Sequence, residues 1–298
     1  MTKFFYSSKY TLKWPGHIFP VEKFELVYKK IKESYGENYI ETPREGSLDD
    51  VLLVHTKEYI DRLYELTKTP ELGYYEFEVP VSGQVLEAVF SSVGGTIAAT
   101  EFAVKNKNCG FNIGGGFHHA HRDRGGGFCI LNDIAIGAKY AQKKLGVKRI
   151  AIVDCDLHQG DGTASIFHND YTVFTFSIHQ ENLYPPKQIS DLDIGLDDFT
   201  EDREYLAKLE EALKVIADRV IPELVIYQAG ADPYEKDQLG CLKITKDGLR
   251  KRDEIVIGWA KAMDIPLVIT LGGGYPPDVN DVVDIHYNTA VTAIKYYL

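Results

Sequence analysis

Short apolar runs alternate with longer segments of helical periodicity along most of the chain, and this pattern strongly limits the folds open to it. Strands separated by helices are joined by crossover connections, so they lie parallel in one sheet with helices on both faces. We therefore predict an α/β fold with a doubly wound, mostly parallel β-sheet in three layers. The predicted strands are residues 111–113, 149–155, 172–178, 224–228 and 266–271.

Helical periodicity fills the segments between these strands. The sequence has no internal repeat, linker or low-complexity tract that would mark a second domain, so we predict a single domain over residues 1–298. Two further helices near the start of the chain are expected to pack on the sheet or to shape its rim. The predicted helices are residues 21–35, 47–66, 82–106, 132–145, 162–168, 202–219, 245–263 and 278 to the end.

The composition excludes several classes of protein. Hydrophobic residues are 44% and charged residues 26%, which is the balance of a globular chain rather than a disordered one. The net charge of −11 argues against a nucleic-acid partner but leaves cationic substrates open. Cys109, Cys129, Cys155 and Cys241 lie far apart without a C-x-x-C pair, so we expect buried thiols rather than disulfides or a cysteine zinc site.

The sequence also shows no membrane or phosphate-binding signal. No apolar run reaches the length that spans a bilayer, and the first residues do not resemble a signal peptide, so we expect a cytoplasmic protein with no membrane span. The glycine triplets at 114–116, 125–127 and 272–274 lack the G-x-G-x-x-G spacing and a following Lys-Ser/Thr. A phosphate cradle is therefore not predicted.

Four predicted strands are each followed directly by side chains able to do chemistry. In an open parallel sheet, ligands bind beyond the carboxyl ends of the strands, so we expect these groups to share one site. In strand order, the groups are His118 and His119; Asp156, His158 and Asp161; Asp232; and Tyr275.

The densest of these segments is Asp154-Cys-Asp156-Leu-His158. In extended backbone its two carboxylates and its imidazole would point to the same side, and such crowding requires a compensating cation. Oxygen and nitrogen ligands without cysteine suit Zn²⁺, Fe²⁺ or Mn²⁺, and three protein ligands with open positions are typical of a catalytic site. We assign Asp156, His158 and Asp232 as the metal ligands.

Each of these signals also has a structural explanation. An aspartate at a strand end often caps the following helix, and adjacent histidines are more often structural than catalytic. Asp232 precedes a proline and could simply begin a turn, while Tyr275 could be a turn residue after glycines. The site hypothesis is favoured because all of these features fall at the same edge of one predicted sheet.

Four motifs follow one another along the chain: His118-His119, Asp154-x-Asp156-x-His158-x-x-Asp161, Gly230-Ala-Asp232 and Gly272-Gly-Gly-Tyr275. In this order they resemble the zinc-dependent histone deacetylase superfamily, which has the arginase/deacetylase fold and also contains acetylpolyamine amidohydrolases and acetoin-utilisation proteins. The resemblance covers roughly residues 4 to 295. The stretches 112–119, 123–129 and Asp237-Gln-Leu-Gly240, with only three glycines before the tyrosine, look most like the class IV branch.

The resemblance implies a role for each matching position. Asp156, His158 and Asp232 would hold Zn²⁺, with Fe²⁺ as an alternative. His118 and His119 would be the catalytic tandem pair, Asp154 and Asp161 would hydrogen-bond them, and Tyr275 would be an electrophilic phenol. K⁺ would bind near the zinc site through Asp154, Asp156, His158, Ser177 and the backbone of Ile178. The substrate-binding positions would be Gly127, Phe128, Gly273 and Tyr184, with Phe128 as one wall of a narrow tunnel.

The implied reaction is hydrolysis of an N-acyl-lysine amide in a protein or peptide, with longer fatty acyl groups among the candidate substrates. An acetylpolyamine amidohydrolase of the same superfamily is the main alternative. An arginase-like binuclear manganese hydrolase would need an Asp-x-His-x-Asp run, but the carboxylate after His158 comes three residues later. A non-enzymatic reader of acyl-lysine would be expected to lack Tyr275 or a metal ligand. The acyl length, the substrate's identity and the oligomeric state stay open.

Overall fold

The computed structural model describes residues 1–12 and 16–297; residues 13–15, and position 298 at the end of the last predicted helix, lie outside the described part. Within it, eight strands form one sheet in the order β2-β1-β3-β8-β7-β4-β5-β6, and every neighbouring pair is parallel. The predicted doubly wound α/β fold is confirmed. The strands are β1 (Lys3–Phe5), β2 (Ile40–Glu41), β3 (Cys109–Asn112), β4 (Ile150–Asp154), β5 (Val173–Gln180), β6 (Leu192–Leu196), β7 (Leu224–Gln228) and β8 (Leu267–Thr270).

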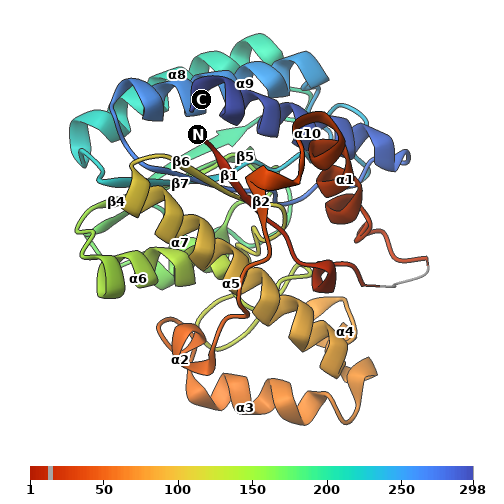
Figure 1. Cartoon of the computed structure of the whole chain (residues 1–298). Helices are drawn as coiled ribbons and strands as arrows, with labels where there is room; N and C mark the ends of the chain where they lie inside the picture. Colours follow the sequence, from red (N-terminus) through yellow and green to blue (C-terminus); the bar gives the residue numbers. More distant parts are fainter. Residues whose placement is uncertain (13–15, 298) are drawn as a thin grey trace.

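Helices cover both faces of this sheet (Figure 1). α1, α8, α9 and α10 pack together on one face, whereas α5, α6 and α7 lie on the other, with α2, α3 and α4 beyond α5. The helices are α1 (Lys23–Tyr35), α2 (Leu48–Val51), α3 (Lys57–Leu66), α4 (Tyr74–Phe77), α5 (Gly83–Asn106), α6 (Asp133–Leu145), α7 (Asp161–Phe167), α8 (Asp202–Arg219), α9 (Lys246–Ala262) and α10 (Val279–Tyr296).

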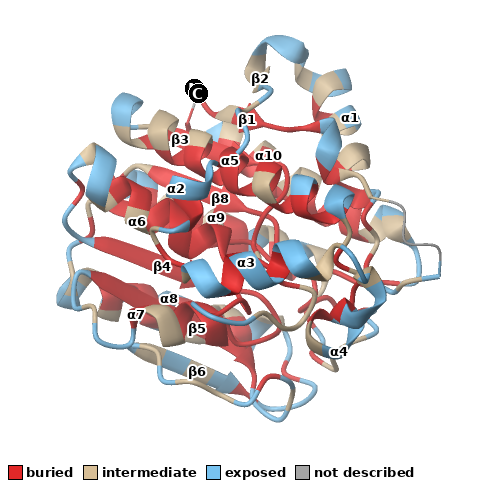
Figure 2. Cartoon of the chain, turned by 90° about the horizontal axis from the view of Figure 1, so that it is seen from below, coloured by how far each residue is buried: buried red, intermediate tan, exposed pale blue. Residues whose placement is uncertain are grey.

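The central strands divide the apolar core into two layers because successive side chains point to opposite faces. On β4, Ala151 and Val153 pack into the core under α8, α9 and α10, whereas Ile150 and Ile152 pack into the core under α5 and α6. All five residues of β4 are buried, as expected for a parallel strand covered on both sides. Figure 2 shows this buried centre, with the edge strand β6 more exposed.

Side-chain caps define where several helices begin. Ser82 accepts a hydrogen bond from the backbone of Val85 at the start of α5, and Thr245 does the same for Gly248 at α9. The single helix predicted over residues 47–66 is wrong, since the structure has two helices there. α2 ends after one turn at Val51, and Thr56 caps the separate α3.

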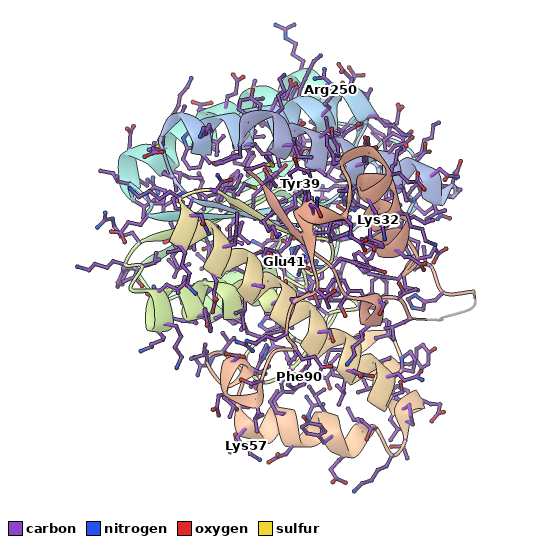
Figure 3. All side chains as sticks on the ribbon, in the orientation of Figure 1. Lys32, Tyr39, Glu41, Lys57, Phe90 and Arg250 are labelled. Atoms are coloured by element: carbon purple, nitrogen blue, oxygen red, sulfur yellow. The ribbon has the colours of Figure 1, made fainter. Side chains whose placement is uncertain are left out.

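The five predicted strands are present with ends shifted by at most a few residues, and β7 matches its predicted range. β1, β2 and β6 were not predicted, because two of them are very short and the third is only partly buried. Charged side chains such as Lys57 on α3 and Arg250 on α9 project from the outer helices (Figure 3). In the described part of the chain, no helix combines the length and apolar character needed to cross a bilayer.

Candidate metal-dependent active site

The three predicted metal ligands lie together at the carboxyl edge of the sheet. Asp156 and His158 follow β4, and Asp232 follows the neighbouring β7. One ligand atom from each residue lies within 4.8 Å of the others, and all three residues are buried. His158 Nδ1 is 3.4 Å from an oxygen of Asp156 and 3.3 Å from an oxygen of Asp232. The cluster therefore offers two carboxylates and one imidazole to a single point.

The convergence of these side chains has a different cause from the predicted one. β4 ends at Asp154, so the alternation of an extended strand does not continue through His158. Instead, Asp154 Oδ1 accepts a hydrogen bond from the backbone N–H of Asp156 at 3.1 Å, and Asp156 Oδ1 accepts one from His158 N–H at 3.1 Å. In each of these two turns an aspartate side chain bonds the backbone N–H two residues later. The turns bend the chain and orient Asp156 and His158.

Electrostatics indicate that this cluster fits a cation. Burial and the carboxylate of Asp156 raise the pKa of Asp232 to about 6. Burial would lower the pKa of His158, but Asp156 and Asp232 together raise it to about 10. Without a metal, a protonated His158 offsets only part of the negative charge of the two carboxylates. A divalent cation held by the same oxygen and nitrogen atoms would take over that role, so the residues fit the metal that the sequence predicts.

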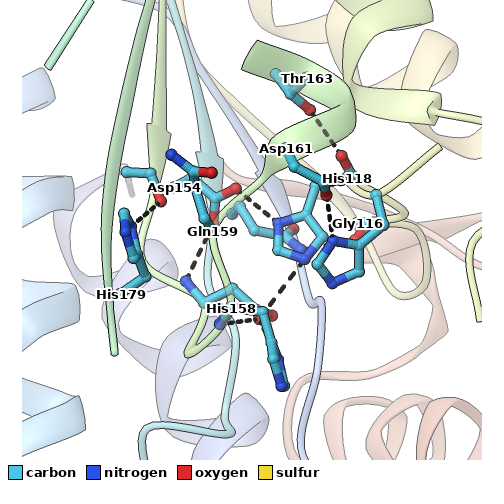
Figure 4. A network of polar contacts seen from close by, with 12 residues as sticks. Gly116, His118, Asp154, His158, Gln159, Asp161, Thr163 and His179 are labelled. Atoms are coloured by element: carbon cyan, nitrogen blue, oxygen red, sulfur yellow. Dashed lines mark hydrogen bonds and ion pairs between the residues drawn. The ribbon is translucent and has the colours of Figure 1, made fainter. Parts of the chain in front are cut away.

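His118 packs against this cluster (Figure 4). Its Nδ1 is 2.7 Å from Asp154 Oδ2, and its Nε2 is 3.6 Å from an oxygen of Asp156. Burial would lower the pKa of His118, but the carboxylates of Asp154 and Asp156 outweigh it and raise the pKa to about 9. The predicted partnership of His118 with Asp154 is present in the structure.

His119 occupies a contrasting environment although it is the next residue. Its Nδ1 is 2.6 Å from Asp161 Oδ1, which matches the predicted pair. Burial and the adjacent His118 lower the pKa of His119 to about 4, so its imidazole is neutral near pH 7. With Nδ1 bonded to Asp161, its Nε2 is left on the pocket side, where the ring lines the cavity. This is the form of histidine that accepts a proton.

Tyr275 lies across the same pocket on the segment that follows β8. Its hydroxyl is held neutral because burial and the carboxylates of Asp232 and Asp156 raise its pKa well above the usual value. Its backbone N–H donates to Asp237 Oδ2 at 2.7 Å. Gly273 donates its N–H to Asp156 Oδ2 at 2.9 Å, and a β-carbon at this position would come within 2.1 Å of Asp232. Glycine is therefore required for the ligands to sit this close to the backbone.

Aromatic rings form the wall above the cluster. Phe128 lies 5.8 Å from the Tyr275 ring and 5.9 Å from Phe19, centroid to centroid. Tyr184 faces His119 at 5.2 Å and lines the mouth of the pocket together with Phe128. Gly127 passes so close to His119 that a β-carbon there would lie 2.5 Å from the ring. The four predicted substrate-binding residues, Gly127, Phe128, Gly273 and Tyr184, all border this pocket.

Three of the residues predicted to hold K⁺, Asp154, Ser177 and Ile178, lie on the neighbouring strands β4 and β5. Ser177 on β5 is the register partner of Asp154 on β4, and Ile178 follows it. The hydroxyl of Ser177 is 2.9 Å from His179 Nδ1. These groups are buried next to the metal cluster, while their role toward a monovalent cation stays a prediction.

Several residues that shape the site were missed by sequence reasoning. Lys23 at the start of α1 is fully buried, and its ammonium donates to the carbonyl of Gly272 at 2.8 Å. Asp133 accepts hydrogen bonds from the backbone N–H groups of Gly116 and Phe117, and so fixes the loop that precedes His118. Phe19 contributes to the aromatic wall. A lysine, an aspartate or a phenylalanine in these contexts carries no local signal of such a role.

Comparison with known proteins agrees with this arrangement. The model of the histone deacetylase domain family matches residues 17–290. An uncharacterized protein of Picosynechococcus sp. is 39% identical over 91% of this chain and 90% of its own length. Histone deacetylase 2 of Arabidopsis thaliana is 36% identical over 91% of this chain and 73% of its own.

A solved structure shows the same fold. A histone deacetylase homologue complexed with SAHA superposes with a TM-score of 0.84, at 26% identity, over 98% of this chain and 84% of the other. The family match covers most of the sequence and includes every strand end that supplies the site. The chain therefore belongs to the histone deacetylase family.

Proposed function

We propose that the protein is a metal-dependent hydrolase that removes acyl groups from lysine side chains. The observation that carries this proposal is the geometry at the bottom of the pocket, called the floor below, where the metal-ligand cluster lies. A neutral histidine, a histidine paired with a buried carboxylate and a neutral phenol surround a cluster of two carboxylates and an imidazole. A deacetylase activity is also what the names of several relatives describe.

Asp156, His158 and Asp232 would hold the metal, which we propose to be Zn²⁺ or Fe²⁺. When bound there, such an ion polarises an acyl carbonyl and lowers the pKa of a water molecule. We also propose that K⁺ binds beside it through Asp154, Ser177 and the backbone of Ile178. A monovalent ion at this position would offset the negative charge of Asp154 without competing for the site of hydrolysis.

The remaining steps belong to side chains of the chain itself. His119 accepts the proton of the attacking water at Nε2, because Asp161 fixes its Nδ1–H. His118 lies beside the carboxylates of Asp154 and Asp156. Its positive charge stabilises the negative charge that develops on the substrate, and its Nε2 delivers a proton to the leaving amine. The hydroxyl of Tyr275 donates a hydrogen bond to the oxygen that becomes negative in the transition state, a contribution typically worth about 3–4 kcal/mol.

The shape of the pocket supports a long, thin substrate group. Phe128 and Tyr184 enclose the mouth, and the reactive groups lie at the bottom. A lysine side chain joins an amide to a peptide backbone by four methylenes, so it suits an aromatic passage of this kind. The net charge of −11 also favours small cationic molecules, and an acetylpolyamine is the second candidate substrate.

An apolar pocket next to the floor supports acyl groups longer than acetyl. It shares Phe19, Gly115, Phe117 and Phe128 with the reactive pocket, and its other lining residues are mostly aliphatic, among them Val85 and Val89. We also propose that the protein belongs to the class IV branch of the family, which the stretches 112–119, 123–129 and 237–240 resemble. We further propose that residues 1–298 act as one catalytic domain, because both halves of the chain supply strands to the same sheet.

The test is a substrate panel with the metal-loaded protein. One peptide is prepared with acetyl, butyryl, octanoyl and myristoyl lysine, and acetylputrescine is assayed beside it. We expect at least one peptide to release its acyl group as the carboxylic acid and to keep an unmodified lysine side chain. This activity should be lost with a chelator and recovered with Zn²⁺ or Fe²⁺. Hydrolysis of acetylputrescine alone would favour the polyamine alternative. No hydrolysis of any compound at full metal occupancy would refute the proposed function.

A further inference from the structure

Asp161 accepts contacts from two histidines rather than one. Its Oδ1 is 2.6 Å from His119 Nδ1, and its Oδ2 is 3.0 Å from His121 Nε2. His121 is almost completely enclosed, with 4% of its surface exposed. The proposed reaction uses His118 and His119 but gives His121 no role. Its position behind Asp161 therefore calls for a separate explanation.

We propose that His121 is a positioning residue that acts on His119 through Asp161. The inference rests on the proposed function, since it assigns His121 to the orientation of the histidine that accepts the proton. His121 does not line the reactive pocket; the carboxylate of Asp161 lies between it and His119.

The hydrogen-bond partners define the tautomers along this row. The guanidinium of Arg124 lies 3.2 Å from both ring nitrogens of His121, so it does not select one of them as the acceptor. The carboxylate of Asp161 can only accept, so Nε2 of His121 carries a proton and donates it to Oδ2. Asp161 in turn accepts the Nδ1 proton of His119. The row of His121, Asp161 and His119 thus leaves the Nε2 lone pair of His119 free on the pocket side.

A carboxylate bonded through one oxygen can still rotate about the bond that joins it to its side chain. Because His121 engages the second oxygen, both oxygens of Asp161 are fixed, and the direction of the bond to His119 is fixed with them. The backbone closes the arrangement, as the N–H of His121 donates to the carbonyl of Arg124 at 2.8 Å. Partners of this kind, one step removed from the reacting group, typically change activity by about 10- to 100-fold.

Two substitutions separate the hydrogen bond from the volume of the ring. In His121→Gln the side-chain amide can donate to Asp161 from the position of Nε2, whereas His121→Met has similar length and no donor. We expect His121→Met to lower kcat by about 10- to 100-fold with KM within about twofold. His121→Gln should retain most of the wild-type kcat. His168, an exposed histidine after α7, provides the control His168→Met, which should behave as wild type.

A double substitution tests whether the effect passes through Asp161. Once Asp161→Ala has removed the carboxylate, adding His121→Met should lower kcat no further, because the route between the two histidines is already broken. A purely structural role of His121 would instead give losses that multiply. Equal loss in the Gln and Met variants, or multiplying losses in the double variant, would overturn the proposal.

A second readout does not depend on turnover. The Nδ1 proton of His119, held by Asp161, should give a downfield proton resonance in the wild-type protein, identified by its absence in His119→Gln. We expect this resonance to weaken or shift in His121→Met and to persist in His121→Gln. If the wild type hydrolyses no substrate, the proposed function fails, and this resonance alone decides the role of His121. An unchanged resonance in His121→Met would contradict the proposed role.

Discussion

The floor and the wall of the pocket are built in different ways. The floor residues Asp156, Asp232 and Gly273 come from the segments directly after β4, β7 and β8, and they are tied together by hydrogen bonds from backbone N–H groups. The wall residues Phe19 and Phe128 come from loops far apart in the chain and meet through a ring contact. The floor is thus held by directional polar bonds, and the wall by packing.

This difference indicates a division of roles. Directional bonds fix reacting groups to within fractions of an ångström, as catalysis requires. Ring contacts are less directional and tolerate changes in shape, so the wall can vary with the substrate while the floor stays fixed. Substitutions in the floor should therefore reduce turnover, whereas substitutions in the wall should mainly change substrate binding.

The largest effect is expected for a metal ligand. Asp156→Asn removes one of the two negative charges that would hold the cation, so metal content after dialysis should fall well below that of the wild type, and activity should fall by about a thousandfold or more. Elemental analysis of the dialysed protein measures this. Asp61→Asn on the exposed face of α3 is the matched control. A full equivalent of metal in Asp156→Asn would show that the floor does not depend on this carboxylate.

Tyr275→Phe keeps the ring in the wall and removes only the hydroxyl from the floor. We expect kcat to fall by about a hundredfold or more, because a transition-state hydrogen bond is lost. Metal content should equal that of the wild type. Steady-state kinetics with the best acyl-lysine peptide provide the measurement. Near-normal kcat would remove the phenol from the chemistry and leave Tyr275 as a wall residue only.

Phe128→Ala tests the wall directly. It removes the ring that lies against Phe19 and Tyr275, and we expect kcat/KM to fall by about tenfold, mostly through KM. The same change at the exposed Phe199 serves as the control. If kcat fell as steeply as in Tyr275→Phe, the proposed separation between floor and wall would be wrong.

The smallest effect is expected for Gln159, which supports the loop of the wall residue Tyr184. Gln159 donates to the carbonyl of Gln188 and accepts from its N–H, so it ties down the loop that carries Tyr184. Gln159→Ala removes both of these hydrogen bonds to the backbone of Gln188. It should therefore raise KM by about two- to threefold and speed tryptic cleavage after Lys187. Gln142→Ala, on the surface of α6, is the control. Unchanged proteolysis would mean that this loop is held by other contacts.

The sequence predicted the floor because strand ends are a local feature. The apolar run of β4 followed by Asp156 and His158 can be recognised from neighbouring residues, and parallel strands bring their carboxyl ends to one edge. Even so, the local geometry was inferred wrongly. β4 stops at Asp154, and hydrogen bonds from carboxylates to the N–H two residues later, rather than strand alternation, orient the ligands.

The wall and the supports of the site depend on contacts between distant segments. Lys23 meets Gly272 across 249 positions of sequence, and His121 meets Asp161 across 40, with no local pattern to announce either contact. The sequence by itself determined the parallel sheet, the edge at which the chemistry gathers and the candidate ligands, because hydrophobic periodicity and strand ends are encoded by neighbouring residues. Only the tertiary structure decided which loops enclose that edge and which buried groups orient its histidines, because those contacts arise when the helices and loops pack around the finished sheet.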